Sequence, residues 1–145
     1  MNWGMFTGYE PNGAPYEITG NWGLFASHIR GYMKRLLLKT PWGYVRLHWI
    51  LRADAGRDLH DHPFDFTSLI LRGGYTEETE RVSGERTRSN FRAGDVVRRK
   101  AELAHSLVAV LPGTLTLVFG GKKRKEWGFW TNQGWVMWKQ YFKNA

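Results

Sequence analysis

The sequence predicts an all-β sandwich or small barrel preceded by one helix. A helical pattern of apolar residues ends near Pro41, and beyond it apolar and polar residues alternate with a period of two. Glycine-containing turns divide this second region into many short runs. Numerous short strands after a single helix are typical of antiparallel sandwiches and barrels.

The length of 145 residues indicates one domain. We divide it into an N-terminal arm and helix (1–40), a barrel (41–121) and tryptophan-rich C-terminal strands (122–145). Because the chain has no cysteine, disulfides, thiolate metal ligands and a cysteine nucleophile are excluded. Any metal must be held by histidine and carboxylate.

The first part of the chain is expected to form an arm and then a helix. Residues 1–21 are rich in glycine, asparagine, proline and aromatic residues, which favours irregular structure. The apolar residues of 22–39 share one face of a helix, with Asn21 as a candidate cap and Pro41 beyond the end. These residues are Leu24, Phe25, Ile29, Tyr32, Met33, Leu36 and Leu37.

The segment after Pro41, "GYVRLHWILRA", reads as a strand with two different faces. One face carries apolar side chains from Val45 to Leu51, and the other carries Arg46, His48 and Arg52. We favour the polar face as the outer one. Further strand-like runs follow as far as "GWVMWKQYF" at the C-terminal end.

The charge and the hydropathy pattern restrict the partners. The formal net charge is +8, which favours an anionic partner. There is no apolar run of about 18 residues, so we expect no membrane span. The N-terminal sequence lacks a basic start and an apolar core, so it is not a signal peptide and a cytoplasmic protein is expected.

The stretch "LHDHPFDF" holds the main chemical signal. Residues two apart on a strand point to the same side, so His60 and His62 should project together. Pro63 supports this, because a residue before proline is biased towards extended backbone. Two adjacent imidazoles can donate nitrogens to one metal ion at about 2.0–2.1 Å, although a further ligand must come from elsewhere.

The pattern resembles the first motif of the cupin superfamily, an HxH pair followed by a glutamate and a closing glycine, for which Gly74 is in place. The second cupin motif ends in a histidine, and His105 stands at the matching distance from Gly94. The resemblance covers roughly residues 46–121. It implies a double-stranded β-helix, the jelly-roll barrel of the cupins, and a metal held by His60, His62 and His105.

The sequence also departs from the cupin pattern. The expected glutamate would fall at Phe66 or Thr67, and neither is a carboxylate. Asp65 is a candidate substitute ligand if the backbone twists after Pro63. Three-histidine centres occur in cupins such as thiol dioxygenases of the cysteine dioxygenase type. The resemblance therefore implies Fe(II) as the metal, with Mn, Ni or Zn as alternatives.

Basic residues close to the second motif are candidates for binding substrate. One of Arg98 and Arg99 must face inward on an alternating strand, where it needs an anionic partner. That partner is either a substrate carboxylate or phosphate, or a nearby Glu102 or Asp95. We expect the basic segment 120–127 to form an exposed hairpin tip, and the tryptophans after it to pack rather than to stack on a ligand.

The leading functional hypothesis is a metal-dependent cupin enzyme acting on a small anionic molecule, by dioxygenase-type chemistry or by metal-assisted hydrolysis of an ester or phosphodiester. One alternative is a non-catalytic cupin that sequesters an anionic nucleotide or sugar. Another is a metal-free epimerase or isomerase that uses a histidine–aspartate pair and Tyr75. Nucleic-acid binding ranks last because no motif supports it. Since cupins often pair, a homodimer is expected.

Overall fold

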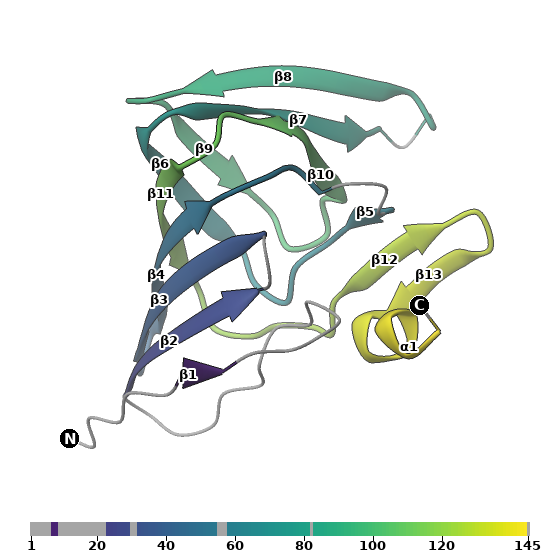
Figure 1. The fold of residues 1–145 in the computed structure, drawn as a ribbon. Helices are drawn as coiled ribbons and strands as arrows, with labels where there is room; N and C mark the ends of the chain where they lie inside the picture. The colour runs from purple at the N-terminus through teal and green to yellow at the C-terminus, as the bar shows by residue number, and fades with distance from the viewer. Residues whose placement is uncertain (1–6, 9–22, 30–31, 55–57, 82, 145) are drawn as a thin grey trace.

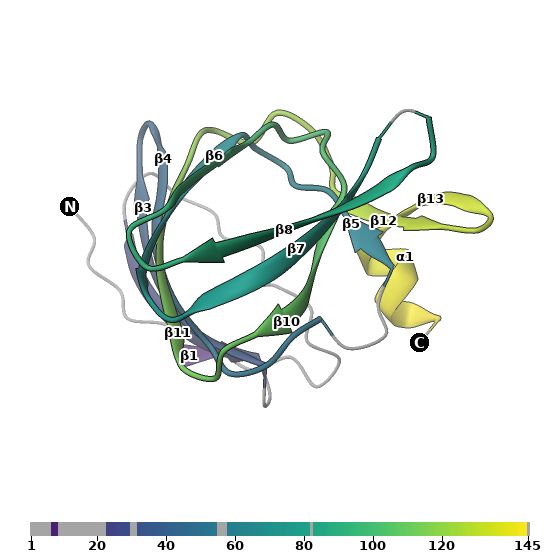
Figure 2. The same cartoon turned by 90° about the horizontal axis from the view of Figure 1, so that it is seen from above.

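The computed structural model describes residues 7–8, 23–29, 32–54, 58–81 and 83–144. These residues form two β-sheets that face each other and curve around a common interior, which gives the barrel seen in Figures 1 and 2. The prediction of a nearly all-β barrel is confirmed. No helix among the described residues is long and apolar enough to cross a membrane.

The first sheet has seven strands in the spatial order β1-β2-β3-β4-β11-β6-β9. Their bounds are β1 Thr7–Gly8, β2 Gly23–Ile29, β3 Met33–Thr40, β4 Gly43–Ile50, β11 Thr114–Gly120, β6 Phe66–Arg72 and β9 Val96–Arg99. The second sheet has the order β13-β12-β5-β10-β7-β8. Its strands are β13 Gly134–Met137, β12 Gly128–Thr131, β5 Leu59–His60, β10 His105–Val110, β7 Gly74–Glu80 and β8 Arg86–Arg92.

The helix predicted over residues 22–39 is wrong. Residues 23–29 and 33–40 form β2 and β3, which pair with each other, and β3 continues the sheet onto β4 in unbroken register from Met33↔Ile50 to Thr40↔Gly43. In β3 the side chains of Met33 and Leu37 are buried whereas Leu36 is exposed, which is strand alternation. Pairing with β4 therefore overrode the helical spacing of the same apolar residues. The predicted arm, apart from Thr7–Gly8, and the Asn21 cap lie outside the described residues.

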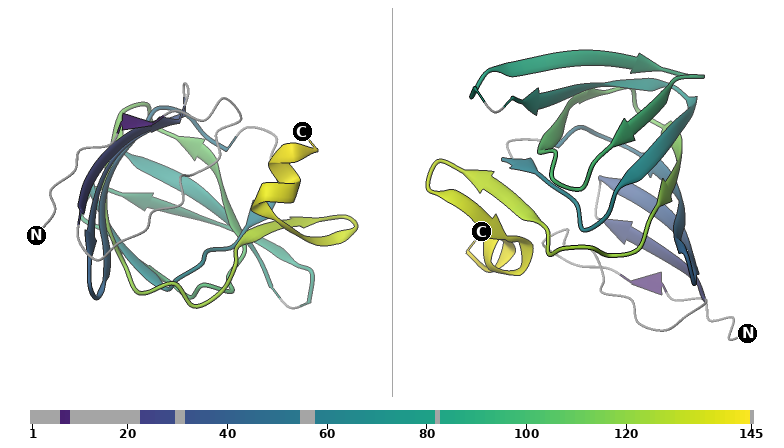
Figure 3. Two further views of the ribbon diagram at one scale, coloured as in Figure 1. Left: turned by 90° about the horizontal axis from the view of Figure 1, so that it is seen from below. Right: turned by 180° about the vertical axis from the view of Figure 1, so that it is seen from behind.

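The C-terminal region is only partly as predicted. β12 and β13 are tryptophan-rich strands, as expected, and they pair as a hairpin, but the second half of the last run is a short helix, α1 (Trp138–Lys143), rather than a strand. Trp138, Tyr141 and Phe142 lie three and four residues apart, so one helical face packs them around Phe129. The hairpin and α1 project together from one side of the barrel (Figure 3).

The interior of the barrel is unusually polar. A small apolar cluster of Tyr32, Met33, Ile50 and Leu107 occupies part of it. Elsewhere the buried side chains include hydroxyls, a carboxylate and an imidazole, among them Ser68, Glu77, His105, Thr114 and Thr116. Burying a polar group is unfavourable unless it forms hydrogen bonds. So many buried polar side chains therefore indicate a binding site rather than a core that serves packing alone.

Candidate metal centre

Strand pairing brings the first and the last of the three motif histidines together. His60 on β5 lies directly opposite His105 on β10 in an antiparallel pair, so both side chains leave the sheet on the same face. The chain then continues to His62, whose backbone N–H donates to the Ala101 carbonyl at 3.0 Å. This bond ties the end of the HxH segment to the loop before β10.

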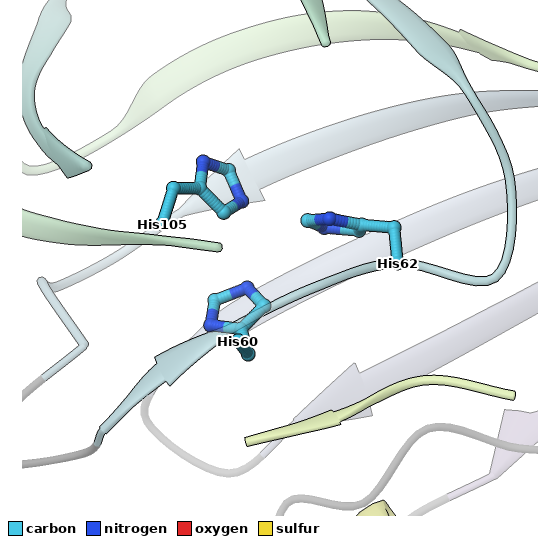
Figure 4. A group of neighbouring side chains, drawn as sticks. All are labelled: His60, His62 and His105. Carbon is cyan, nitrogen blue, oxygen red and sulfur yellow. The ribbon is translucent and has the colours of Figure 1, made fainter. Parts of the chain in front are cut away.

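The three imidazoles turn towards one common space (Figure 4). Their ring centroids are 5.2 Å apart for His60–His62, 4.9 Å for His60–His105 and 4.8 Å for His62–His105. One ring nitrogen from each lies within 4.8 Å of the others. Nitrogens bound to one ion at about 2.0–2.1 Å are roughly 3 to 4 Å apart, so side-chain movements on the order of 1 Å would complete a shared coordination site.

The chemistry of this cluster suits a metal ion. The pKa of His62 is well below its usual range, because burial disfavours the charged ring and because His105, His60, Arg46 and His48 add positive charge nearby. A metal ligand must be a neutral imidazole. In addition, His62 Nδ1 is buried with no hydrogen-bond partner among the described residues. Such an orphaned nitrogen is costly in the free protein and is expected in a site that binds a ligand.

Glu77 orients His105. The Nδ1 atom of His105 lies 2.5 Å from Glu77 Oε1, so an Nδ1–H donated to this carboxylate leaves Nε2 as the ligating nitrogen. Arg99 also donates to Glu77, with its Nε at 3.1 and 3.2 Å from the two carboxylate oxygens. Burial would raise the pKa of Glu77, but the bonds from His105 and Arg99 outweigh it and lower the pKa to about 2.

Our sequence reasoning missed Glu77, although a signal for it existed. Tyr75 and Glu77 are two residues apart on one predicted strand, so an inward Tyr75 implies an inward Glu77. A carboxylate inside a barrel needs cationic or N–H partners. The need for such partners would have pointed to His105 and to Arg99, which are the residues that bind Glu77 in the structure.

The structure does not bring the predicted substitute ligand to the cluster. The group of metal-competent side chains in the described part of the chain contains His60, His62 and His105 but not Asp65. The Asp65 carboxylate instead accepts hydrogen bonds from the Ala101 N–H at 2.8 Å and from Arg124 at 2.7 Å. Its pKa is lowered chiefly by these two bonds.

Phe66 stands close to the histidines where a cupin glutamate was expected. Its ring centroid is 4.7 Å from that of His62 and 6.0 Å from that of His105. On another side, the rings of Trp127 and Phe129 lie 6.3 and 5.8 Å from His60. Aromatic rings therefore pack around the cluster on two sides.

The candidate substrate-binding residues lie in different surroundings. Arg99 faces inward, but its partner is Glu77 rather than Glu102 or Asp95. Arg98 is exposed on the opposite side of β9. Tyr75 packs against the apolar cluster, and burial, reinforced by the charge of Glu77, raises its pKa to about 12. Its phenol therefore stays protonated at neutral pH.

The polar face of β4 points into the barrel, so the expectation that it is the outer face is wrong. Arg46 and His48 pair with Val118 and Thr116 of β11, whose side chains are buried, whereas Trp49 on the other face is 44% exposed. Alternation had grouped the residues correctly, but it cannot tell which face is inside when both contain large side chains. Arg52, beyond the end of β4, is exposed.

The carboxylate of Asp61, which lies between the two histidines in the chain, accepts three hydrogen bonds. They come from the Gly128 N–H at 2.8 Å, Lys125 Nζ at 2.7 Å and Trp135 Nε1 at 3.0 Å. It therefore faces the β12–β13 hairpin. The basic segment 120–127 is a connection to that hairpin rather than a hairpin tip, and Arg124 and Lys125 form ion pairs with Asp65 and Asp61.

Comparisons with known proteins agree with this geometry. No family model matches the sequence, and no curated protein matches it. Solved structures do match. KdgF from Halomonas sp. has a TM-score of 0.52 and 22% identity, over 68% of this chain and 86% of that one. The oxalate decarboxylase–formate complex from Lactobacillus farciminis has a TM-score of 0.59 and 14% identity, and the match covers 93% of this chain and 41% of that one.

The Drosophila melanogaster CENP-C cupin domain also matches, with a TM-score of 0.55 and 16% identity over 74% of this chain and 85% of that domain. At these identities the likeness concerns the fold. Together with the two facing sheets and the three converging histidines, it shows that this chain has the cupin fold and that His60, His62 and His105 fit the HxH metal site of that fold.

Proposed function

We propose that this protein is a metal-dependent cupin enzyme that acts on a small anionic molecule, with one divalent ion held by His60, His62 and His105. The observation that carries the proposal is the convergence of three ring nitrogens within 4.8 Å in a polar barrel, one of them oriented by a buried carboxylate. Three neutral imidazoles fit Fe(II), and Mn, Ni and Zn suit the same set.

When bound, such an ion would supply Lewis-acid chemistry and open coordination positions. The protein's own residues have clear complementary functions. Glu77 holds the proton on His105 Nδ1 and so fixes the ligating tautomer. The rings of Phe66, Trp127 and Phe129 pack around the histidines. Because no carboxylate joins the described metal-competent group, the set is uncharged, and a bound ion would keep its full positive charge for an anionic substrate.

The named structural neighbours support an anionic substrate. They include oxalate decarboxylase as a formate complex and hydroxypropylphosphonic acid epoxidase from S. wedmorenis in complex with fosfomycin, at a TM-score of 0.51 and 10% identity. These names belong to enzymes for small organic acids. The neighbour CENP-C is described as bound to CAL1, which keeps non-catalytic binding as the second candidate, one that the missing carboxylate ligand also favours.

Metal content is the test of this proposal. Protein purified without a histidine tag and loaded with Fe(II) under anaerobic conditions, or with Zn(II), should contain one ion per chain by mass spectrometry of the metals. The His60→Ala/His105→Ala variant should lose it, with affinity reduced by more than the roughly 10- to 100-fold typical of losing an outer-shell partner.

Asp65→Asn is the matched control, because Asp65 lies close in sequence but is bonded to Ala101 and Arg124. This variant should keep one ion per chain. Metal retained by the double histidine variant, or lost on substitution of Asp65, would contradict the proposed ligand set. A native protein that binds no ion but co-purifies with a small anion would favour the sequestering function instead.

A further inference from the structure

Arg46 is a half-buried cation that has no carboxylate partner in the described part of the chain. Its guanidinium carbon lies 4.6 Å from the ring centroid of Phe64 and 5.1 Å from that of Tyr44. Among the described residues no acidic side chain forms an ion pair with it. Burial, with repulsion from Arg35, lowers its pKa to about 9, so the group is still charged at neutral pH.

The buried carboxylates of the described chain are all committed elsewhere. Asp54 accepts from the Leu107 N–H, and Asp61 accepts from the β12–β13 hairpin and Lys125. Glu77 binds His105 and Arg99, and Glu78 binds Arg86 and Arg88. Among the buried carboxylates of the described residues, none therefore remains as a counter-charge for Arg46. An unpaired buried charge is strongly unfavourable, and such a group is retained where a ligand supplies the missing partner.

His48 adds a second unsatisfied polar group on the same side of β4. Its Nε2 atom is buried with no hydrogen-bond partner among the described residues. The residues two apart on β4 share the inward face, so His48 and Arg46 line the same wall of the barrel. This wall adjoins the metal-competent cluster through Phe64, whose ring centroid lies 4.6 Å from the Arg46 guanidinium carbon and 6.5 Å from the ring centroid of His62.

We propose that Arg46 and His48 form a carboxylate-binding subsite beside the three-histidine cluster, and that the substrate is therefore a small organic acid. The inference rests on the proposed function and names its substrate class. A guanidinium edge matches the two oxygens of one carboxylate, and an imidazole N–H can donate to one of them. Because the rings of Phe64 and Tyr44 pack against the guanidinium of Arg46, its N–H edge is the part that remains for a ligand.

This assignment transfers substrate binding from Arg98 and Arg99 to Arg46. Arg99 already has a carboxylate partner in Glu77, and Arg98 faces away from the interior. A single guanidinium with one neutral imidazole also suits one negative charge better than two. We therefore expect a carboxylate to bind more tightly than a phosphate dianion.

The test uses metal-free protein, so that its outcome does not depend on the ion. Sodium propionate, sodium phosphate and sodium chloride are titrated at matched ionic strength, with the thermal midpoint and calorimetric affinity as readouts. Propionate should bind saturably and raise the midpoint. In Arg46→Met its affinity should fall at least about tenfold, whereas Arg92→Met, an exposed arginine on β8, should bind as the native protein does.

Two further measurements keep the proposal open to refutation. Without ligand, Arg46→Met should have a higher thermal midpoint than the native protein, because a half-buried unpaired charge has been removed. Arg46→Lys, which keeps the charge but not the planar fork, should bind propionate more weakly than Arg46 does. Equal propionate binding by Arg46→Met, or tighter binding of phosphate than of propionate, would overturn the subsite.

Zinc stoichiometry measured on the same samples separates this inference from the proposed function. Arg46→Met should still take up one zinc ion per chain. Arg46-dependent propionate binding by a protein that takes up no metal would refute the metal centre alone. A full metal complement with no Arg46 dependence would refute the subsite alone.

Discussion

Replacing Glu77 with glutamine is expected to lower the free energy of unfolding by about 3–5 kcal/mol, the range for breaking a buried ion pair from one side. The Glu77 side chain is almost fully buried and satisfies both His105 and Arg99. Glutamine keeps the shape but not the charge, and its amide presents N–H groups to donors. Urea denaturation of metal-free protein measures the change. The affinity for Zn(II) should also fall about 10- to 100-fold.

The control for this prediction removes both partners. In Glu77→Leu/Arg99→Leu no uncompensated charge remains, so stability should recover much of what Glu77→Gln loses. Metal affinity should stay low, because His105 still lacks its acceptor. A double variant as unstable as the single one would show that the ion pair is not the source of the loss. Native metal affinity in both variants would refute the orienting function of Glu77.

The same carboxylate predicts the acid side of the stability profile. The pKa of Glu77 is lowered from 4.5 to about 2 in the folded protein, so the unfolded chain binds its proton first as the pH falls. The stabilisation is complete above about pH 4.5 and is lost as the pH approaches 2. This difference corresponds to about 3 kcal/mol. Stability measured between pH 5 and 2 should therefore fall less steeply in Glu77→Gln; an unchanged slope would contradict the shift.

Most of the barrel could be predicted from sequence because strand alternation and glycine turns are local signals. The region from β4 to β11 shows both, and the structure confirms its strands. The segment 33–40 was different, because its apolar residues fit a helical period. Met33 and Leu37, which are four residues apart and both buried, also fit the period of two of a strand. Only the pairing of β3 with β4 decides between them, and that contact is absent from a local pattern.

The candidate site, like the barrel, could be predicted from sequence only in part. His60, His62 and His105 could be found because their spacing resembles a known motif, and the structure brings them together. Glu77 and Arg46 belong to no motif. Their importance arises from which charges share the interior, and this depends on the register of strands distant in sequence. The three candidate ligands could therefore be found from sequence, but not the carboxylate that orients His105 or the cation that lies near the cluster.

Replacing Asp61 with alanine is expected to lower the free energy of unfolding by about 3–4 kcal/mol and to detach the tryptophan hairpin from the barrel. The Asp61 carboxylate is 2% exposed and satisfies Gly128, Lys125 and Trp135 at once. Its removal leaves a buried N–H and a half-buried ammonium without partners. Urea denaturation followed by tryptophan fluorescence measures both effects, because Trp135 loses its bond to the carboxylate.

Two matched variants show whether this loss comes from the buried carboxylate. Trp135→Phe removes one of its bonds and should cost about 1 kcal/mol. Asp58→Ala removes a nearby, half-buried carboxylate that accepts from Tyr141 at 3.2 Å, and should also cost about 1 kcal/mol. If Asp61→Ala is no more costly than these two, Asp61 is not the anchor of the hairpin.

The bonds of Asp61 also affect the candidate metal centre, because Asp61 lies between His60 and His62 in the chain. Its bonds to Gly128 hold the backbone between the two ligands against β12, through both the side chain and the Asp61 N–H, which donates to the Gly128 carbonyl at 3.0 Å. Asp61→Ala should therefore also weaken Zn(II) binding, although Asp61 itself is not a ligand. Unchanged zinc affinity together with reduced stability would show that the HxH segment keeps its geometry without the hairpin.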